Sequence, residues 1–389
     1  MADHSLLSAE ATTILTDLVR IPSVNPDLVP GAAGEAAIAA HICGLMRSWG
    51  LDVLNREVAP GRHNAIGILR GTGGAQARTL LFNGHMDTVS VAGMADPFSG
   101  DIRPSTGSGQ GGKLFGRGAY DMKGSLAATL AAAHAVAQRG RPLRGDVIFT
   151  FVADEEYASI GTEAVVADIA AGRLPRPDAA INTEPTETKV GIGHKGFAWI
   201  EVETHGQAAH GSRPDLGVDA IVQMGKVLVE LERLQQRLSS GQRHPLLGTG
   251  SVHASLINGG RELSSYPDLC TLHVERRTVP SESEQQIANE IGDIFQRVIQ
   301  SDHDFAATSR VTFVRNPWQA DTQSDIVQMV SQSAARVTGR AAENATFTFW
   351  LDAALLGDAG IPCVVFGPTG AGAHAMEEWV DVDSLGVCA

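Results

Sequence analysis

Short apolar runs alternate with longer stretches of helical periodicity in the first half of the chain, and the pattern returns near its end. The apolar runs have the length and flanking residues of buried strands and cover residues 79–82, 146–152, 178–182 and 362–366. Two further strands are expected at 52–58 and 65–70. Apolar residues at helical spacing predict helices at 8–20, 34–49, 123–138, 162–171 and 323–337. This succession predicts an α/β fold, a mainly parallel sheet with helices on both faces.

A segment with a different texture interrupts this pattern. A half-exposed strand is predicted at 197–204, further strands at 250–257, 268–276 and 306–314, and helices at 218–238 and 282–299. The resulting order, β-α-β-β-α-β, is that of a small ferredoxin-like domain with two layers. We therefore expect a discontinuous larger domain, residues 1–194 and 317–389, with an inserted domain at 195–316.

Composition excludes several classes of partner. The 389 residues carry a formal net charge of -14 without any basic run, which argues against nucleic acid. The chain shows neither the pattern of a signal peptide nor an apolar run long enough to span a membrane. Four scattered cysteines, Cys43, Cys270, Cys363 and Cys388, lack the spacing of a disulfide framework or a thiolate metal site. These features predict a cytoplasmic protein.

Acidic residues and histidines follow the predicted strands at their carboxyl ends, where open α/β sheets hold their active sites. The residues at strand ends are His85, Asp87, Glu155, Glu156, Glu184 and His374. Asp121, which lies just before the predicted helix at 123–138, joins them as a candidate. Each alone is compatible with a solvated turn, but their repetition at successive strand ends favours metal ligands. Imidazoles and carboxylates without a thiolate suit Zn²⁺, and also Co²⁺ or Mn²⁺.

Charge favours two metal ions over one. Asp121, Glu156 and Glu184 would supply three negative charges against the four positive charges of two divalent ions, and a hydroxide would supply the fourth. The adjacent pair Glu155 and Glu156 points to opposite sides of the backbone, so one can bind metal while the other acts as general base. Asp87 lies two residues after His85 and is expected to accept its imidazole N–H.

Five motifs carry a resemblance to a known family. They are NGHMDTV, GRGAYDMKG, ADEE, NTEPT and GQAAHGSRPDLGVDAI, and they occur in order over nearly the whole chain. The chain resembles the dinuclear zinc amidohydrolase superfamily, which includes acetylornithine deacetylase, succinyl-diaminopimelate desuccinylase, aminoacylase-1 and carboxypeptidase G. The resemblance implies a zinc exopeptidase-like catalytic domain, with the inserted domain serving as a lid and dimerisation domain in a homodimer.

The resemblance also assigns roles to the strand-end residues. It implies two Zn²⁺ per chain, with Asp121 bridging them. His85 and Glu184 would complete one site, and Glu156 and His374 the other. Glu155 would be the general base and Asp87 the partner of His85. A cis peptide bond is implied between Asp121 and Met122.

Further residues would bind substrate or stabilise the reaction. By resemblance, His210 reaches the active site of a partner subunit and stabilises the oxyanion. Arg277 would hold a substrate carboxylate, although the neighbouring Arg276 is a rival for this role. Asn258 matches a substrate contact of the family. The backbone N–H of Gly372 and its neighbours offers another contact for a carboxylate, but conformation explains such glycines equally well.

The activity that follows is hydrolysis of an amide bond in a small molecule with a free carboxylate, most simply an N-acyl amino acid. A carboxypeptidase or dipeptidase would use the same residues. A metal-binding protein without catalysis is disfavoured because no ligand or base is missing. The glycine-rich segment 106–112 suggests a nucleotide-dependent enzyme, but it lacks the Lys-Ser/Thr of a P-loop.

The sequence departs from the family pattern in one strand and adds aromatic residues elsewhere. Glu275 stands where many relatives have Asp. Tyr266, Phe349 and Trp350 are most simply strand and core residues. If they line the pocket instead, a bulky or apolar acyl group becomes plausible.

Overall fold

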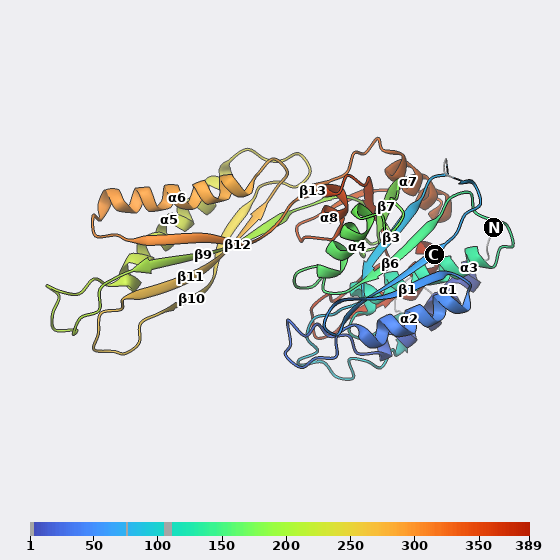
Figure 1. Ribbon diagram of the computed structural model, residues 1–389, viewed down its shortest axis with the longest axis horizontal. Helices are drawn as coiled ribbons and strands as arrows, with labels where there is room; N and C mark the ends of the chain where they lie inside the picture. Colours follow the sequence, from blue (N-terminus) through green and yellow to red (C-terminus); the bar gives the residue numbers. More distant parts are fainter. Residues whose placement is uncertain (1–3, 75–76, 105–110) are drawn as a thin grey trace. The chain divides into compact units, whose positions relative to one another are not determined.

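The computed structural model describes residues 4–74, 77–104 and 111–389, which form two compact units. The first unit contains the described parts of 1–192 together with 320–345 and 351–389. The second contains 193–319 and 346–350. Each unit has its own sheet (Figure 1). Each unit also has its own hydrophobic core.

The central sheet of the first unit is parallel in its middle and antiparallel at its edges. Its strands are β1 (Asp52–Ala59), β2 (Arg62–Leu69), β3 (Leu80–His85), β6 (Val147–Val152), β7 (Ala179–Asn182), β8 (Val190–His194) and β15 (Cys363–Val365). They run in the order β1-β2-β6-β3-β7-β15-β8, and the short strands β13 (Trp318–Gln319) and β14 (Asn344–Phe347) both pair with β8. β6, β3, β7 and β15 pair in parallel, and β1, β2 and β8 join antiparallel. The predicted mainly parallel sheet is therefore confirmed.

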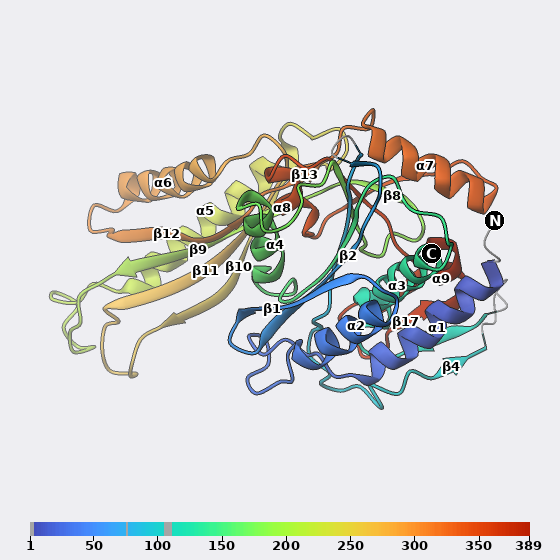
Figure 2. The same cartoon turned by 45° about the vertical axis from the view of Figure 1, so that its right-hand side comes forward.

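Helices cover both faces of this sheet. The helices are α1 (His4–Arg20), α2 (Ala36–Ser48), α3 (Gly124–Ala137), α4 (Ile160–Ala170), α7 (Asp325–Thr338), α8 (Ala353–Asp358) and α9 (Val382–Cys388). Residues of α1, α2, α3 and α9 form one hydrophobic cluster with Phe149 and Phe151 of β6 (Figure 2). Ile148 of the same strand is fully buried outside that cluster, as expected for a strand covered on both faces. No helix among the described residues is long and apolar enough to cross a membrane.

The second unit has the predicted β-α-β-β-α-β order. It consists of β9 (Gly196–His205), α5 (Ala220–Ser240), β10 (Ser251–Gly259), β11 (Leu269–Thr278), α6 (Glu284–Ser301) and β12 (Ala307–Arg315). The antiparallel sheet has the order β10-β11-β9-β12. Its alternating buried residues share one hydrophobic core with both helices. Asp219 and Ser283 cap α5 and α6 by accepting backbone N–H groups.

Three short segments fall in a different unit from the one predicted. Residues 193–194, 317–319 and 346–350 belong to the second unit, whereas the sequence analysis assigned them to the larger domain. The contacts of residues 346–350 explain the difference for that segment. The carbonyl of Phe347 accepts a hydrogen bond from Lys195 N, and Trp350 packs edge-on against Phe197. The catalytic and dimerisation roles of the two units stay predictions.

A small third sheet was not predicted. It pairs β16 (Gly370–Ala371), β17 (Trp379–Asp381), β5 (Lys113–Phe115) and β4 (Ile102–Arg103), in that order. The sheet joins the segment before Asp121 to the segment around His374. The glycine-rich segment 106–112 lies mostly outside the described residues, which resume at Gly111.

Candidate metal centre

Neighbouring parallel strands bring the first group of candidate ligands together. His85 ends β3, which pairs with both β6 and β7. The Nε2 atom of His85 lies 3.2 Å from Oδ1 of Asp121 and 3.7 Å from Oε1 of Glu184. One ligand atom from each residue lies within 4.8 Å of the others, close enough to hold a single ion.

A second group shares Asp121 with the first. The Nε2 atom of His374 lies 3.0 Å from Oε2 of Glu156 and 3.5 Å from Oδ2 of Asp121. The ligand atoms of these three residues again lie within 4.8 Å of one another. Asp121 therefore turns one carboxylate oxygen toward His85 and the other toward His374, which is the disposition of a bridging ligand.

Asp121 lies in an irregular turn before α3. The turn is a π-helical segment, Ala119–Lys123, in which Asp121 and Met122 have non-helical backbone angles. The peptide bond between Asp121 and Met122 is cis, as the resemblance implied. His374, in the connection between β16 and β17, has a positive φ of 61°.

Burial and crowding raise the pKa of most carboxyl groups in the cluster. Burial raises the pKa of Glu155 well above its ordinary value; His85 opposes the shift, while Glu184 and Asp352 add to it. Burial and the charge of Asp121 raise the pKa of Glu156 to about 7. The pKa of Glu184 is raised well above its ordinary value, mainly by burial. So many acids at one buried place are costly unless cations balance them.

The donor set fits divalent metal ions. Within the described part of the chain, the buried atoms Oε1 of Glu156 and Oε1 of Glu184 have no hydrogen-bond partner. A buried carboxylate oxygen without a donor is unfavourable, and a cation would satisfy it. Two imidazoles with carboxylates match the preferences of zinc and neighbouring metals.

Asp87 does more than the sequence suggested. The Nδ1 atom of His85 lies 3.0 Å from the backbone carbonyl oxygen of Asp87 and 3.5 Å from its carboxylate. The carboxylate accepts hydrogen bonds from the side chain of Asn25 at 2.8 Å and from the backbone N–H groups of Glu155 at 3.1 Å and Glu156 at 3.2 Å. Asp87 therefore holds both His85 and the turn that carries the two glutamates.

Glu155 lies beside the first group without belonging to it. Its Oε2 atom is 3.9 Å from Nε2 of His85. Among the described residues, neither metal-binding group includes it. This placement suits an acid that faces a reacting molecule rather than an ion.

Two buried acids near the cluster escaped the sequence analysis. Asp352, which lies just before α8, accepts a hydrogen bond from the hydroxyl of Thr162 at 2.6 Å. Glu378 lies four residues after His374 and binds the turn of Asp121. The sequence analysis found its candidates directly after predicted strands. Neither of these two acids follows such a strand, so no signal in the sequence pointed to them.

The remaining candidates, apart from Gly372, belong to the second unit. His210 is exposed, with Nδ1 at 2.8 Å from the hydroxyl oxygen of Ser212. Asn258 is exposed on β10. Tyr266 is half-buried; Phe349 is 50% exposed and Trp350 is 8% exposed.

The arginine doublet on β11 divides into a buried and an accessible member. Arg276 is fully buried and pairs with Glu282 at 2.7 Å and Glu290 at 2.9 Å. The side chain of Arg277 is 30% exposed and pairs with Glu275 at 2.6 Å. Because the contacts of Arg276 already occupy its guanidinium group, Arg277 is the better candidate to bind a carboxylate.

Gly372 lies in the first unit, near His374. Its φ is 89°, and a Cβ atom there would lie 2.0 Å from the carbonyl oxygen of Glu377. Backbone conformation and close packing thus explain the glycine. A substrate contact at Gly372 stays a prediction.

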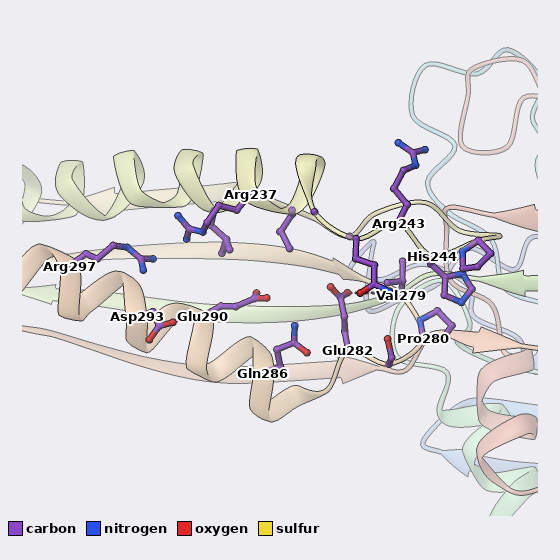
Figure 3. Close-up of a pocket in the computed structure, with 17 residues that line it drawn as sticks. Arg237, Arg243, His244, Val279, Pro280, Glu282, Gln286, Glu290, Asp293 and Arg297 are labelled. Atoms are coloured by element: carbon purple, nitrogen blue, oxygen red, sulfur yellow. Dashed lines mark hydrogen bonds between the residues drawn. The ribbon is translucent and has the colours of Figure 1, made fainter.

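A pocket of about 470 Å³ lies elsewhere, between the end of α5 and the start of α6 (Figure 3). Charged side chains of both signs line it, including Arg237, Glu282 and Arg297. None of the site residues predicted from the sequence lines this pocket. It therefore does not coincide with the metal centre.

The chain is similar to a deformylase and to a deacetylase of known name. An N-formyl-4-amino-5-aminomethyl-2-methylpyrimidine deformylase of Bacillus subtilis is 28% identical over 381 residues, which cover 92% of this chain and 87% of that protein. An acetylornithine deacetylase of Myxococcus xanthus is 32% identical over 331 residues, covering 84% of this chain and 81% of that protein.

The fold has close counterparts among solved structures. An M20 family metallo-carboxypeptidase from Sulfolobus solfataricus superimposes with a TM-score of 0.75 at 16% identity, covering 97% of this chain and 96% of that chain. Residues 81–389 match the sequence pattern of peptidase family M20/M25/M40. That match includes every candidate ligand from His85 to His374, and the chain belongs to the peptidase family M20/M25/M40.

Proposed function

We propose that this M20 enzyme holds two divalent cations, with Zn²⁺ as the first candidate, and removes the acyl group from an N-acyl amino acid. The observation that carries the proposal is the position of Asp121. Its two carboxylate oxygens face two different histidines, 3.2 Å and 3.5 Å away. Each histidine has a further buried carboxylate beside it, Glu184 or Glu156.

The chain's own residues would divide the work of amide hydrolysis. When bound, the cations would lower the pKa of a water molecule toward about 7 and polarise the substrate carbonyl. Oε2 of Glu155 would accept the proton of the attacking water and return it to the leaving amine. The carboxylate of Asp87 would hold Glu155 in place by accepting the backbone N–H of Glu155. Asp87 would also fix the orientation of His85.

Residues of the second unit would complete the site. We assign His210 of one subunit the role of stabilising the oxyanion of the tetrahedral intermediate in the active site of the other subunit of a homodimer. Arg277, with Asn258 beside the substrate, would hold the free carboxylate. Edge strand β10 exposes Leu256 and Ile257, which are 67% and 55% accessible, and this apolar edge supports the proposed dimer interface.

The relatives support acyl removal as the first candidate activity. A deformylase and a deacetylase both detach a small acyl group from nitrogen, and they match most of this chain. The similarity of fold to a metallo-carboxypeptidase keeps peptide hydrolysis as the second candidate. The free state of all four cysteines fits the proposed cytoplasmic location.

A substrate panel tests the proposed activity. The purified enzyme, loaded with Zn²⁺ or Co²⁺, is assayed against N-formyl and N-acetyl amino acids and against dipeptides. We expect the largest kcat/KM for an N-acyl amino acid with a free carboxylate, and a large loss when that carboxylate is amidated. Faster hydrolysis of dipeptides than of every acylated amino acid would favour the peptidase instead.

The adjacent glutamates should separate catalysis from metal binding. Glu155→Gln should retain both ions and lower kcat by about 10²–10⁴, because only proton transfer is lost. Glu156→Gln should bind fewer ions because it removes a ligand. Metal content by mass spectrometry and kcat are measured for both variants. Near-normal turnover by the Glu155 variant would remove that residue from the role of base.

Complementation tests the role of His210 across the dimer. His210→Ala should lower kcat by about 10²–10³ while the ions remain bound. Mixed with Glu155→Gln under conditions that exchange subunits, it should regain activity, because some hybrid dimers contain one site with both residues intact. Asp215→Asn, on the same loop, is the control and should stay active, because this side chain is 58% exposed and pairs with Arg213 rather than with His210. Inactive hybrids would show that His210 does not act in trans.

A further inference from the structure

Glu378 is a buried acid with an unusual set of partners. It is 1% exposed and immediately precedes β17. Its Oε1 atom accepts the backbone N–H groups of Tyr120 and Asp121, both at 2.9 Å. Its Oε2 atom accepts the backbone N–H of Gly118 at 3.0 Å and the guanidinium of Arg117 at 2.6 Å. One carboxylate thus receives four hydrogen bonds from the turn that presents Asp121.

These bonds fix the main chain at the shared ligand. Asp121 has no regular helical geometry, so the hydrogen-bond ladder of α3 does not hold its N–H group. Glu378 takes that group and the preceding N–H of Tyr120 instead. These two hydrogen bonds therefore hold the main chain from which the Asp121 side chain projects.

The same residue ties this turn to the segment of His374. Glu378 and His374 lie in one connection between β16 and β17, and β17 pairs with β5 just before the Asp121 turn. Arg117 strengthens the link because it also donates to the carbonyl oxygen of Ala375 at 2.9 Å. The Glu378 backbone carbonyl accepts the N–H of Gly116 at 3.1 Å. Glu378 therefore connects the segments of Asp121 and His374, two candidate ligands of the second group.

We propose that Glu378 is a positioning residue for the metal centre: it sets the bridging orientation of Asp121 and fixes the distance from Asp121 to His374. The proposal rests on the proposed function, since it presupposes that the cluster binds two ions. Its main effect falls on the ion held by Asp121, Glu156 and His374. Glu378 itself touches neither ion nor substrate.

The amide variant is the direct test because it keeps the size of the side chain. In Glu378→Gln one oxygen can still accept two N–H groups, but the NH₂ group faces other donors, so buried donors lose their acceptor. Removing a residue that holds a metal ligand in place typically lowers the metal affinity about 10–100-fold. We expect that loss at one of the two ions, measured as Zn²⁺ affinity by competition with a chromophoric chelator.

Glu377→Gln is the matched control. It makes the same change of charge one residue earlier, on an exposed side chain. It should bind both ions as the wild type does. The visible absorption spectrum of the Co²⁺-loaded protein supplies a second readout, because a change of coordination geometry alters it while a loss of stability alone does not. We expect an altered spectrum for Glu378→Gln only.

Two outcomes separate a failure of the proposed function from a failure of the positioning role. A wild type that binds no divalent ions would defeat the proposed function itself. A wild type with two ions, together with a Glu378→Gln protein of unchanged affinity and spectrum, would overturn the positioning role and leave the proposed function intact. If circular dichroism shows that the Gln variant does not fold, Glu378→Asp takes its place. It keeps the charge but falls one methylene short, and it should weaken metal binding in the same direction.

Discussion

The burial of several carboxylates in one cluster is the constraint on which the architecture of the first unit depends. Asp121, Glu155, Glu156 and Glu184 lie together around two histidines, and burial raises the pKa of the three glutamates. An isolated buried carboxylate is unfavourable by several kcal/mol, and a group of them cannot stay ionised without cations. The first unit gathers these carboxylates in one cluster. Shifted pKa values in such a cluster are typical of functional sites.

Two separate structures assemble the cluster. The parallel strands β3, β6 and β7 carry His85, the two adjacent glutamates and Glu184 to one edge of the central sheet. The small sheet of β16, β17, β5 and β4 brings His374 to the turn of Asp121. Asp87 holds the glutamate turn and Glu378 holds the aspartate turn, each through backbone N–H groups. Ligand geometry is therefore set largely by acids that need not touch an ion.

The sequence predicted what depends on local pattern. An apolar run followed by a His or an acid is visible without a structure, and the central sheet and the grouping of its strand-end residues followed from it. The small sheet was missed because its strands have two or three residues each and pair segments far apart in the chain. Asp352 and Glu378 were missed for the same reason, since their partners are distant in sequence.

One uncertainty could have been resolved from the sequence. Cys270, Leu272, Val274 and Arg276 alternate along β11, and all face the core of the second unit. The period of two places Arg276 on the buried face and Arg277 on the other. The aromatic segment around Trp350 could not be placed in this way, because its position depends on contacts with Phe197 and Asn316 rather than on its own periodicity.

The most direct test of the central claim is anomalous diffraction from crystals of the Zn²⁺-loaded protein, recorded at the zinc absorption edge. Two peaks are predicted, about 3.5–4 Å apart, with Asp121 between them. One peak should lie beside His85 and Glu184, the other beside Glu156 and His374. A single peak, or zinc bound away from Asp121, would contradict the account.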